Sequence, residues 1–502
     1  MEALKNKYIG VLDIGTTSVR FILFRLNGHI LSKSSKEIKQ IYPRPGWVEE
    51  DPVQIWEAAE IAINDAILKG KIGKSSILAL GITNQRESVV LWDRDTGRPC
   101  SNLIVWQDRR TARRCRELKD AGYENIIKEK TGLTIDPYFS STKIEWLLKN
   151  NPEIERLNNT KKLAFGTVDS YIIYKLTGNH LTDYSNASRT LLFNISKLCW
   201  DDELLDIFNI DKNILPRVLP CYGNAIFGVT KKESVFGGRI PICSVFGDQQ
   251  GALFGQRCFG KGEIKSTFGT GSFIMLNTGR ERVISKNGLL STIFYSDGKD
   301  TYYALEGSIY NTGSIFQWLR EGLGIIDDYD EMEKLAKDIG YQEDLFMVPA
   351  LTGLGAPYWD PYARGMIIGI NRATSRGEII KAAIEASGFR TADVLKAMVK
   401  DTKLDIQKLK IDGGVTKNRL FCQVLSDITG ISIVKFDIEE ITSLGAMYGA
   451  GIGIGIWDSA SDIKEDMDFE NYLPKIDIKL RNRLYGKWKK AIEKARNWTE
   501  EK

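Results

Sequence analysis

The first 38 residues alternate between apolar runs and short polar turns. An apolar run from Tyr8 to Leu12 ends at Asp13, and a hydroxyl-rich turn then leads into the run VRFILFRL. The turn Asn27-Gly28-His29 separates this run from ILSKSSKEI. Strand, tight turn and strand in this order predict a three-stranded meander over residues 8–38, with the hydroxyl-rich turn inside its first hairpin.

The same design returns about 250 residues later, in GEIKSTFGTGSFIMLNTG at 262–279. A β-rich run again enters a small turn, here Gly-Thr-Gly, and a second apolar run follows it. One such hairpin in each half of the chain predicts two lobes of related fold that face a shared cleft. Helical patterns over 52–68, 377–400 and 478–498 give both lobes a mixed α/β character. We place the boundary after GDQQGALFG, with lobes 1–252 and 253–502.

Two familiar nucleotide fingerprints are excluded by their setting. A P-loop and a dinucleotide fingerprint both need a strand, a glycine-rich loop and then a helix, but the turn after Asp13 leads into another strand. The glycine-rich stretch GAMYGAGIGIGIW at 445–457 lacks the third glycine at the required spacing, because Ile454 stands there. Close packing of a helix with small residues is the favoured interpretation.

Composition narrows the class of protein further. The 502 residues carry 69 basic and 65 acidic side chains, a net charge of +4, which implies neither a nucleic-acid partner nor a membrane surface. The sequence contains no run of about 18 apolar residues, so we expect no membrane span. We also expect no signal peptide, because the N-terminal residues lack its apolar region. Seven scattered cysteines are typical of reduced thiols, so we expect a cytoplasmic protein.

Histidine is scarce, and this limits the possible chemistry. Only His29 and His180 are present, both in expected turns or loops. A Ser-His-Asp triad or a histidine-rich zinc site is therefore improbable, and a general base should be a carboxylate. Asp248 is a candidate, because it ends the strand PICSVF beside Gln249 and Gln250. An ordinary N-cap aspartate is the competing interpretation.

Four other stretches suit ligands, and the first three have a structural alternative. The turns after Asp13 and at 269–271 offer hydroxyls and glycine-flanked amides to phosphate, although either could be a plain turn. Arg86-Glu87 follows the strand LALGIT and could bind a polyol, although a surface ion pair is the simpler explanation. The strand LKID leads through two glycines towards a helix near Asn418, which suits an anion or a nucleotide.

Taken together, these stretches resemble the FGGY carbohydrate kinases over nearly the full length of the chain. The motifs that carry the resemblance are DIGTTSVR (13–20), PGWVEEDP (45–52), GITNQRES (81–88), IVWQDRRTA (104–112), GLTIDPYFSSTKIEWLL (132–148), FGTVDSYIIYKLTG (165–178), TDYSNASRTLLFNI (182–195), GDQQGALFGQ (247–256), STFGTGSF (266–273), ALTGLGAPYWDPYARG (350–365) and IDGGVTKN (411–418). The resemblance implies an α/β fold of two RNase H-like lobes, the actin and hexokinase type of ATPase, around a central cleft. It also implies ATP-dependent, Mg²⁺-assisted phosphorylation of glycerol to sn-glycerol 3-phosphate by a homodimer.

The resemblance also implies roles for individual residues. Those that match the polyol site are Arg86, Glu87, Trp106, Tyr138, Asp248, Gln249 and Phe273. Those that match the nucleotide site are Thr16, Thr17, Ser18, Arg20, Thr270, Gly313, Gln317, Gly414 and Asn418. Asp13 takes the position of the metal-side carboxylate and Asp248 that of the catalytic base.

Departures from the family pattern leave alternatives open. Ile14 replaces a glutamine and Val19 a serine that such kinases often carry, and both side chains should point away from phosphate in a hairpin. A kinase for another polyol or a ketose, such as a pentulose, stays possible. An actin- or Hsp70-like ATPase is a further alternative, which the aromatic residues Trp106, Tyr138 and Phe273 disfavour.

Overall fold

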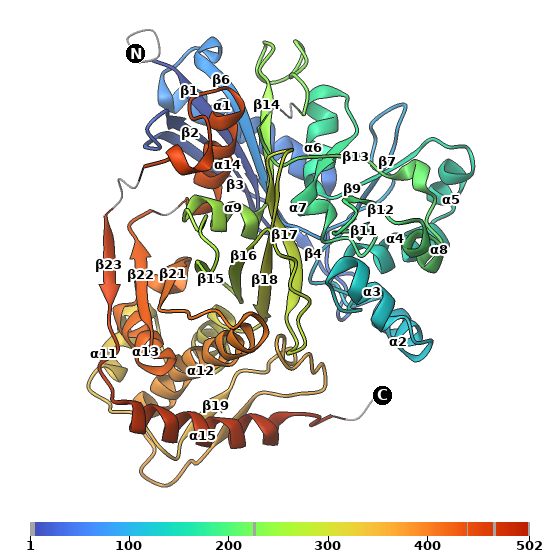
Figure 1. Cartoon of the computed structure of the whole chain (residues 1–502). Helices are drawn as coiled ribbons and strands as arrows, with labels where there is room; N and C mark the ends of the chain where they lie inside the picture. The colour runs from blue at the N-terminus through green and yellow to red at the C-terminus, as the bar shows by residue number, and fades with distance from the viewer. Residues whose placement is uncertain (1–5, 224–226, 439, 465–467, 500–502) are drawn as a thin grey trace.

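Two twisted β-sheets, one in each half of the chain, form the framework of the protein (Figure 1). The computed structural model describes residues 6–223, 227–438, 440–464 and 468–499. The first sheet has the order β14-β6-β1-β2-β3. Its strands are β1 (Tyr8–Ile14), β2 (Ser18–Arg25), β3 (Ile30–Glu37), β6 (Ile77–Asn84) and β14 (Ile242–Gly247). The predicted meander over 8–38 is therefore confirmed.

The second sheet repeats this arrangement and extends it at both edges. Its order is β17-β18-β16-β15-β21-β22-β23. Its strands are β15 (Ile264–Phe268), β16 (Ser272–Gly279), β17 (Leu290–Ser296), β18 (Thr301–Ile309), β21 (Lys408–Asp412), β22 (Ser432–Phe436) and β23 (Phe469–Tyr472). In each sheet an antiparallel meander is followed by two parallel strands: β1 pairs with β6 and β6 with β14, as β15 pairs with β21 and β21 with β22. Two lobes of related fold, expected from the repeated hairpin, are present.

Long helices cover the sheets, and their sequences explain where they begin and end. The main ones are α1 (Pro52–Gly70), α6 (Val168–Thr177), α9 (Asp248–Gly255), α12 (Arg376–Thr402), α13 (Arg419–Thr429), α14 (Ile441–Gly453) and α15 (Ile478–Ala495). Ser375 and Glu378 form a capping box at the start of α12, and Lys403 ends that helix in the left-handed conformation. The predicted helices at 52–68, 377–400 and 478–498 are confirmed to within three residues. Among the described residues, no helix is both long and apolar enough to cross a membrane.

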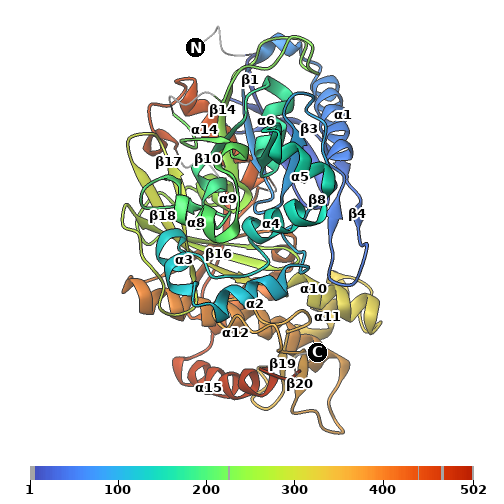
Figure 2. The same cartoon turned by 90° about the vertical axis from the view of Figure 1, so that its right-hand side faces the viewer.

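A third region packs against the side of the first sheet, at the right of Figure 1. It contains α2 (Ala112–Asp120), α3 (Glu124–Thr131), α4 (Ser140–Asn150), α5 (Pro152–Asn159), α7 (Tyr184–Ala187) and α8 (Asp202–Phe208). Its short strands are β4 (Gln40–Ile41), β5 (Glu49–Glu50), β7 (Val90–Asp93), β8 (Leu103–Ile104), β9 (Leu163–Gly166), β10 (Leu181–Asp183), β11 (Phe193–Asn194), β12 (Cys199–Trp200) and β13 (Arg217–Leu219). The second lobe adds α10 (Gly313–Gln317), α11 (Tyr329–Ala336), β19 (Phe346–Val348) and β20 (Met366–Ile368). Figure 2 shows α15 below α12, at the end of this lobe far from the first sheet.

The two halves of the chain are joined by helices α9 and α14, which cross at very short distance. A Cβ atom on Gly445 would lie 1.9 Å from the carbonyl oxygen of Gly251, and one on Gly255 would lie 2.1 Å from that of Ile441. Glycine is required at this crossing because any side chain would separate the helices. The interpretation of 445–457 as a closely packed small-residue helix is confirmed, apart from its last residues.

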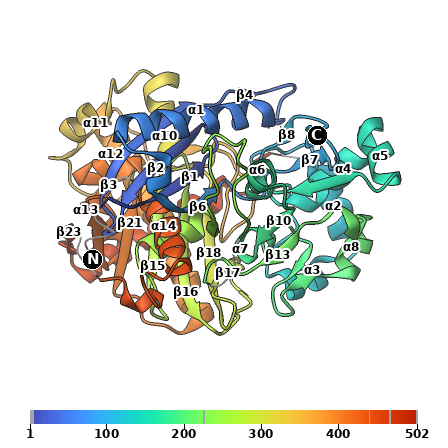
Figure 3. The ribbon, with the colours of Figure 1, turned by 90° about the horizontal axis from the view of Figure 1, so that it is seen from above.

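Helix α14 also shows that the halves are interwoven. It packs against the first sheet and α9 although it comes from the second half of the chain, and Figure 3 shows it beside β1 and β6. Ile9 and Val11 of β1 share a buried apolar cluster with Leu444 and Met447 of α14. The boundary at 252 falls inside α9, and the division into 1–252 and 253–502 stays a prediction.

Candidate active site

Asp13 lies at the end of β1 and is almost completely buried. Its Oδ2 atom is 3.8 Å from the guanidinium of Arg20, the residue opposite it on β2. Burial raises the pKa of Asp13 to about 6; Arg20 opposes the rise, and the carboxylates of Glu440 and Asp248 add to it. Asp13 and Asp248, more than 200 residues apart in the chain, therefore lie close enough to repel each other.

The two departures in the first hairpin have a structural explanation. Ile14 and Val19 are fully buried and belong to the apolar cluster beneath the sheet. Because neighbouring side chains of a strand point to opposite faces, Ile14 faces away from Asp13. The turn itself is closed by a hydrogen bond from the amide of Gly15 to the carbonyl of Ser18. The hydrophobic replacements therefore serve the core.

Arg86 connects several of the predicted polyol residues. Its Nε atom lies 3.2 Å from Oδ1 of Asp248, and one terminal nitrogen lies 2.6 Å from Oε2 of Glu306. The other terminal nitrogen donates to the hydroxyl of Tyr138 at 3.3 Å. The side chain of Arg86 is only 1% exposed, whereas that of Asp248 is 34% exposed. The alternative of a surface ion pair at Arg86-Glu87 is wrong.

Arg189 and Glu306, to which the sequence patterns assigned no role, complete this charged group. Arg189 donates from Nε to Glu87 at 2.7 Å and from a terminal nitrogen to Glu306 at 2.8 Å. Burial opposes ionisation of Glu306, but Arg189 and Arg86 outweigh it and lower its pKa to about 2. Glu87 adopts φ 55°, a left-handed conformation that is strained for this residue type. In the sequence, Glu306 could have been recognised as a candidate because it is a glutamate within the apolar strand TYYALEGSI.

Three aromatic side chains lie beside the charged group. The ring centroid of Trp106 is 5.7 Å from that of Tyr138 and 6.1 Å from that of Phe273, both in edge-to-face geometry. The indole nitrogen of Trp106 donates to Oγ1 of Thr16 at 3.0 Å. With Thr270, these three residues line a hollow of about 390 Å³, here called the aromatic pocket, between the first lobe and β16 of the second.

A second hollow, of about 610 Å³, lies in the second lobe and is here called the glycine-lined pocket. The predicted nucleotide residues that line it are Thr270, Gly313, Gln317, Gly414 and Asn418. The other four do not line it: Thr16 and Thr17 belong to the β1–β2 turn, and Ser18 and Arg20 belong to β2. Thr270 lines both pockets, so the β15–β16 turn is their common wall.

Two successive glycines in the glycine-lined pocket have different reasons to be glycine. Gly413 has φ 100°, and a Cβ atom there would lie 2.3 Å from the carbonyl oxygen of Phe268. A Cβ atom on Gly414 would meet no protein atom within 4 Å. Backbone geometry explains the first glycine. The second leaves space in the pocket, where a ligand can approach the backbone.

Asn418 has a structural use in the same pocket. Its Oδ1 atom accepts from the amide of Phe421 at 2.8 Å and so caps α13. Its Nδ2 atom donates to the carbonyl of Tyr329 at 3.2 Å. The predicted helix start near Asn418 is confirmed, and its side chain fixes the shape of the pocket wall.

Lys265 is a buried cation that the sequence did not single out. Its Nζ atom donates to Oε1 of Gln249 and, at 2.8 Å, to Oγ1 of Thr267. Burial lowers the pKa of Lys265 to about 8, and the carboxylates of Asp412 and Asp248 oppose this shift. The lysine therefore connects α9 of the first lobe to β15 of the second. It holds the amide of Gln249 beside Asp248.

The carboxylates of the site fit a metal ion only in a limited way. Among the described residues, no group of three or more acidic, cysteine or histidine side chains is arranged to hold a metal. Asp13 and its neighbours nevertheless concentrate negative charge where a cation would relieve the repulsion. Mg²⁺ usually takes one or two carboxylates, together with phosphate oxygens and water.

The two lobes share one strand topology, and the turn common to both pockets lies near a carboxylate and buried cations. This arrangement is that of the two-lobed ATPases of the actin and hexokinase type, a class that includes phosphotransferases. Residues 8–255 match the N-terminal domain, and residues 264–454 the C-terminal domain, of the FGGY family of carbohydrate kinases. The chain belongs to this family, as the resemblance in its motifs implied.

Individual relatives agree with this assignment over nearly their full lengths. The chain is 48% identical to glycerol kinase 2 of Thermotoga maritima, over 98% of this chain and 99% of the relative. The crystal structure of Plasmodium falciparum glycerol kinase with ADP superposes with a TM-score of 0.91 at 37% identity, over 97% and 98% of the two chains. Ligand-bound xylulose kinase from Lactobacillus acidophilus superposes with a TM-score of 0.87 at 27% identity, over the same shares.

Proposed function

We propose that this enzyme transfers the γ-phosphoryl group of ATP to glycerol and forms sn-glycerol 3-phosphate. The observation that carries the proposal is the position of Thr270, which lines both the aromatic pocket and the glycine-lined pocket. A nucleotide in the glycine-lined pocket would therefore direct its phosphates towards a polyol held near Trp106 and Tyr138. The relatives named glycerol kinase, at 37–48% identity, support the choice of substrate.

The proposed mechanism uses residues whose positions suit it. Asp248 accepts the proton of the attacking hydroxyl, and Arg86 keeps this carboxylate oriented at 3.2 Å. Trp106 and Phe273 pack on the carbon skeleton, while Arg86 and Glu87 offer a donor and an acceptor to hydroxyl groups. Phosphoryl transfer needs mainly alignment and charge neutralisation, which such a rigid site supplies.

Phosphate would be held by the turns of both lobes. Thr270 and the glycines beside it offer donors from the second lobe, and Thr16, Thr17, Ser18 and Arg20 from the first. Asp13 would hold Mg²⁺, which when bound neutralises charge on the phosphate oxygens. Removal of divalent cations with a chelator should abolish turnover, and added Mg²⁺ should restore it.

A coupled assay across a panel of polyols and ketoses tests the substrate. We expect kcat/KM for glycerol to exceed that for any pentulose, because a site of paired polar groups rejects ligands that leave those groups unsatisfied. Preference for xylulose or ribulose would replace glycerol with a pentulose as the substrate. ATP turnover indifferent to every polyol would instead support an actin- or Hsp70-like ATPase. The cytoplasmic location, expected from the scattered cysteines, and the homodimer, implied by the family, stay predictions, and light scattering measures the second.

A further inference from the structure

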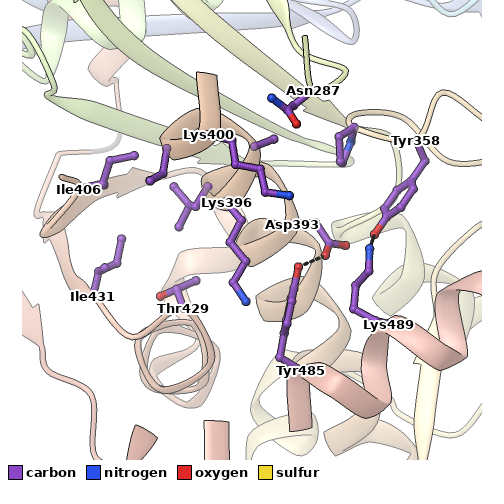
Figure 4. Close-up of a pocket in the computed structure, with 14 residues that line it drawn as sticks. Asn287, Tyr358, Asp393, Lys396, Lys400, Ile406, Thr429, Ile431, Tyr485 and Lys489 are labelled. Atoms are coloured by element: carbon purple, nitrogen blue, oxygen red, sulfur yellow. Dashed lines mark hydrogen bonds between the residues drawn. The ribbon is translucent and has the colours of Figure 1, made fainter. Parts of the chain in front are cut away.

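A third hollow lies on the second lobe, away from both pockets of the candidate active site. It has a volume of about 550 Å³ and opens between α12, the end of α13 and α15 (Figure 4). None of its lining residues lines the aromatic pocket or the glycine-lined pocket. We call it the lysine pocket, after Lys396, Lys400 and Lys489 in its wall.

The three lysines come from two helices at helical spacing. Lys396 and Lys400 are four residues apart on α12, and Tyr485 and Lys489 are four residues apart on α15, so each helix directs one face at the hollow. Figure 4 shows Lys396 and Lys400 reaching into the hollow from α12, with Tyr485 and Lys489 across from them. The pocket is therefore shaped by two rigid elements.

None of these lysines is paired with a carboxylate among the residues that the structure describes. Lys396 Nζ lies 3.1 Å from the ring centroid of Tyr485, and Lys489 donates to the hydroxyl of Tyr358 at 3.2 Å. Burial lowers the pKa of Lys396 to about 8; Asp393 opposes this shift, and the charges of Lys489 and Lys400 add to it. The cations repel one another, and an anion between them would relieve that repulsion.

The single carboxylate in the wall of the lysine pocket is already used. Asp393 accepts from the hydroxyl of Tyr485 at 2.7 Å and from the indole nitrogen of Trp488 at 3.1 Å. The guanidinium of the buried Arg390 lies 3.3 Å from it. The charge of Asp393 is thus balanced by Arg390 outside the pocket wall, so the three lysines give the pocket a net positive charge.

The rest of the wall is apolar. Ile406 and Ile431 stand at one end of the lysine pocket, and Val399 and Pro357 add further apolar surface. Pockets that bind small organic molecules have volumes of about 300–1,000 Å³ and combine apolar walls with a few convergent polar groups. Inorganic ions would use the lysines but leave the apolar end without a contact.

We propose that the lysine pocket binds a small organic anion, with its carboxylate or phosphate between Lys396, Lys400 and Lys489 and its apolar body against Ile406 and Ile431. This site is separate from the proposed kinase reaction and does not depend on its substrate. The charged head provides attraction and orientation, and burial of the apolar body provides the remaining affinity.

Calorimetry with two probes, phenyl phosphate and benzoate, tests this proposal on the full chain. The titrations are made with and without excess ADP and glycerol, which separates probe binding in the active site from binding in the lysine pocket, because ADP is itself an organic phosphate. We expect one site per chain for at least one probe, and which probe binds more tightly distinguishes a phosphate head from a carboxylate. Inorganic phosphate and phenol should each bind at least tenfold more weakly, because phosphate lacks the apolar body and phenol lacks the charged head group.

Variants locate the binding. The double variant Lys396→Met/Lys400→Met should weaken probe binding at least tenfold, whereas Lys490→Met, an exposed lysine on α15 outside the pocket, should leave it unchanged. Lys396→Arg should retain most of the affinity. Thermal unfolding of each variant shows that the fold is kept. Absence of binding by both probes at millimolar concentration, or equal binding by the double variant, would overturn the proposal.

Discussion

The two lobes have the same strand topology but carry different side chains where their strands end. In the first lobe, Asp13 is the penultimate residue of β1, Arg86 and Glu87 come shortly after β6, and Asp248 follows β14. In the second lobe, β15 is followed by Gly269-Thr270-Gly271 and β21 by Gly413 and Gly414. The chain just beyond β6 thus carries charged side chains, whereas the chain just beyond β21, the equivalent strand of the second lobe, carries two glycines.

This difference suits the two lobes to different ligands. Charged side chains at the strand ends of the first lobe suit proton transfer and hydroxyl recognition. Glycines at the strand ends of the second lobe leave backbone amides accessible and keep the glycine-lined pocket open. The fold alone does not assign these tasks, because the same topology occurs in both lobes. Substitutions in either lobe can test the division.

The largest effect is expected for Asp248→Asn in the first lobe. The amide keeps the size of the side chain but cannot accept the hydroxyl proton, so kcat should fall by about 100- to 10,000-fold. Affinity for ADP, measured by calorimetry, should change little because the second lobe holds the nucleotide. A kcat within threefold of the wild-type value would show that Asp248 is not the base.

Glu306→Gln tests the charged connection between the lobes. Loss of its charge leaves Arg86 and Arg189 with one fewer buried partner, and the free energy of unfolding should fall by about 3 kcal/mol. The matched control is Glu263→Gln, whose half-exposed pair with Lys410 at 3.3 Å should contribute below about 1 kcal/mol. Denaturant unfolding measures both, and equal losses would contradict a special role for Glu306.

The ion pairs of Glu306 should also make the stability of the protein depend on pH in the acid range. The pKa of Glu306 is about 2, below its ordinary value of 4.5, so its ionised form is the one that stabilises the folded protein. This stabilisation is complete above pH 4.5 and is lost as the pH falls from 4.5 towards 2. The Glu306→Gln variant should therefore lose less stability over this interval than the wild type.

Gly414→Ala tests the open space of the second lobe. Its Cβ atom meets no protein atom and should therefore occupy the glycine-lined pocket. We expect about tenfold weaker ADP binding, equivalent to about 1.4 kcal/mol, with an unchanged melting temperature. Gly340→Ala, at an equally open exposed position outside the pocket, is the control. Unchanged ADP affinity would mean that the nucleotide does not approach Gly414.

The smallest effect is expected for Lys265→Met, which removes a link between the lobes. Gln249 loses a hydrogen bond to a cation, and KM for glycerol should rise roughly fivefold with kcat nearly unchanged. Because the pKa of Lys265 is about 8, the wild-type KM should rise as the pH increases through 8, while that of the variant should not. A parallel pH profile in both proteins would exclude Lys265 from orienting Gln249.

Sequence patterns predicted the local elements well, because each depends on neighbouring residues. The meander at 8–38, helix α12 and the closely packed α14 follow from strand alternation, helical periodicity and a run of small residues. Arg189, Glu306 and Lys265 were not assigned roles, since a single charged residue in an apolar run gives no indication of its partner. Arg86 likewise had an open alternative until its burial against Glu306 was known.

Asp13 shows most clearly which properties the sequence determines and which depend on the tertiary structure. The sequence by itself determined that a carboxylate stands near the end of the first strand, that a hydroxyl-rich turn follows and that a second such hairpin exists. Only the tertiary structure decided that Asp13 is buried near Asp248, that Ile14 belongs to the core and that Thr270 is shared by two pockets. The reason is physical: hairpins form from local backbone preferences, whereas the pKa of a carboxylate and the shape of a pocket depend on residues brought together from distant parts of the chain.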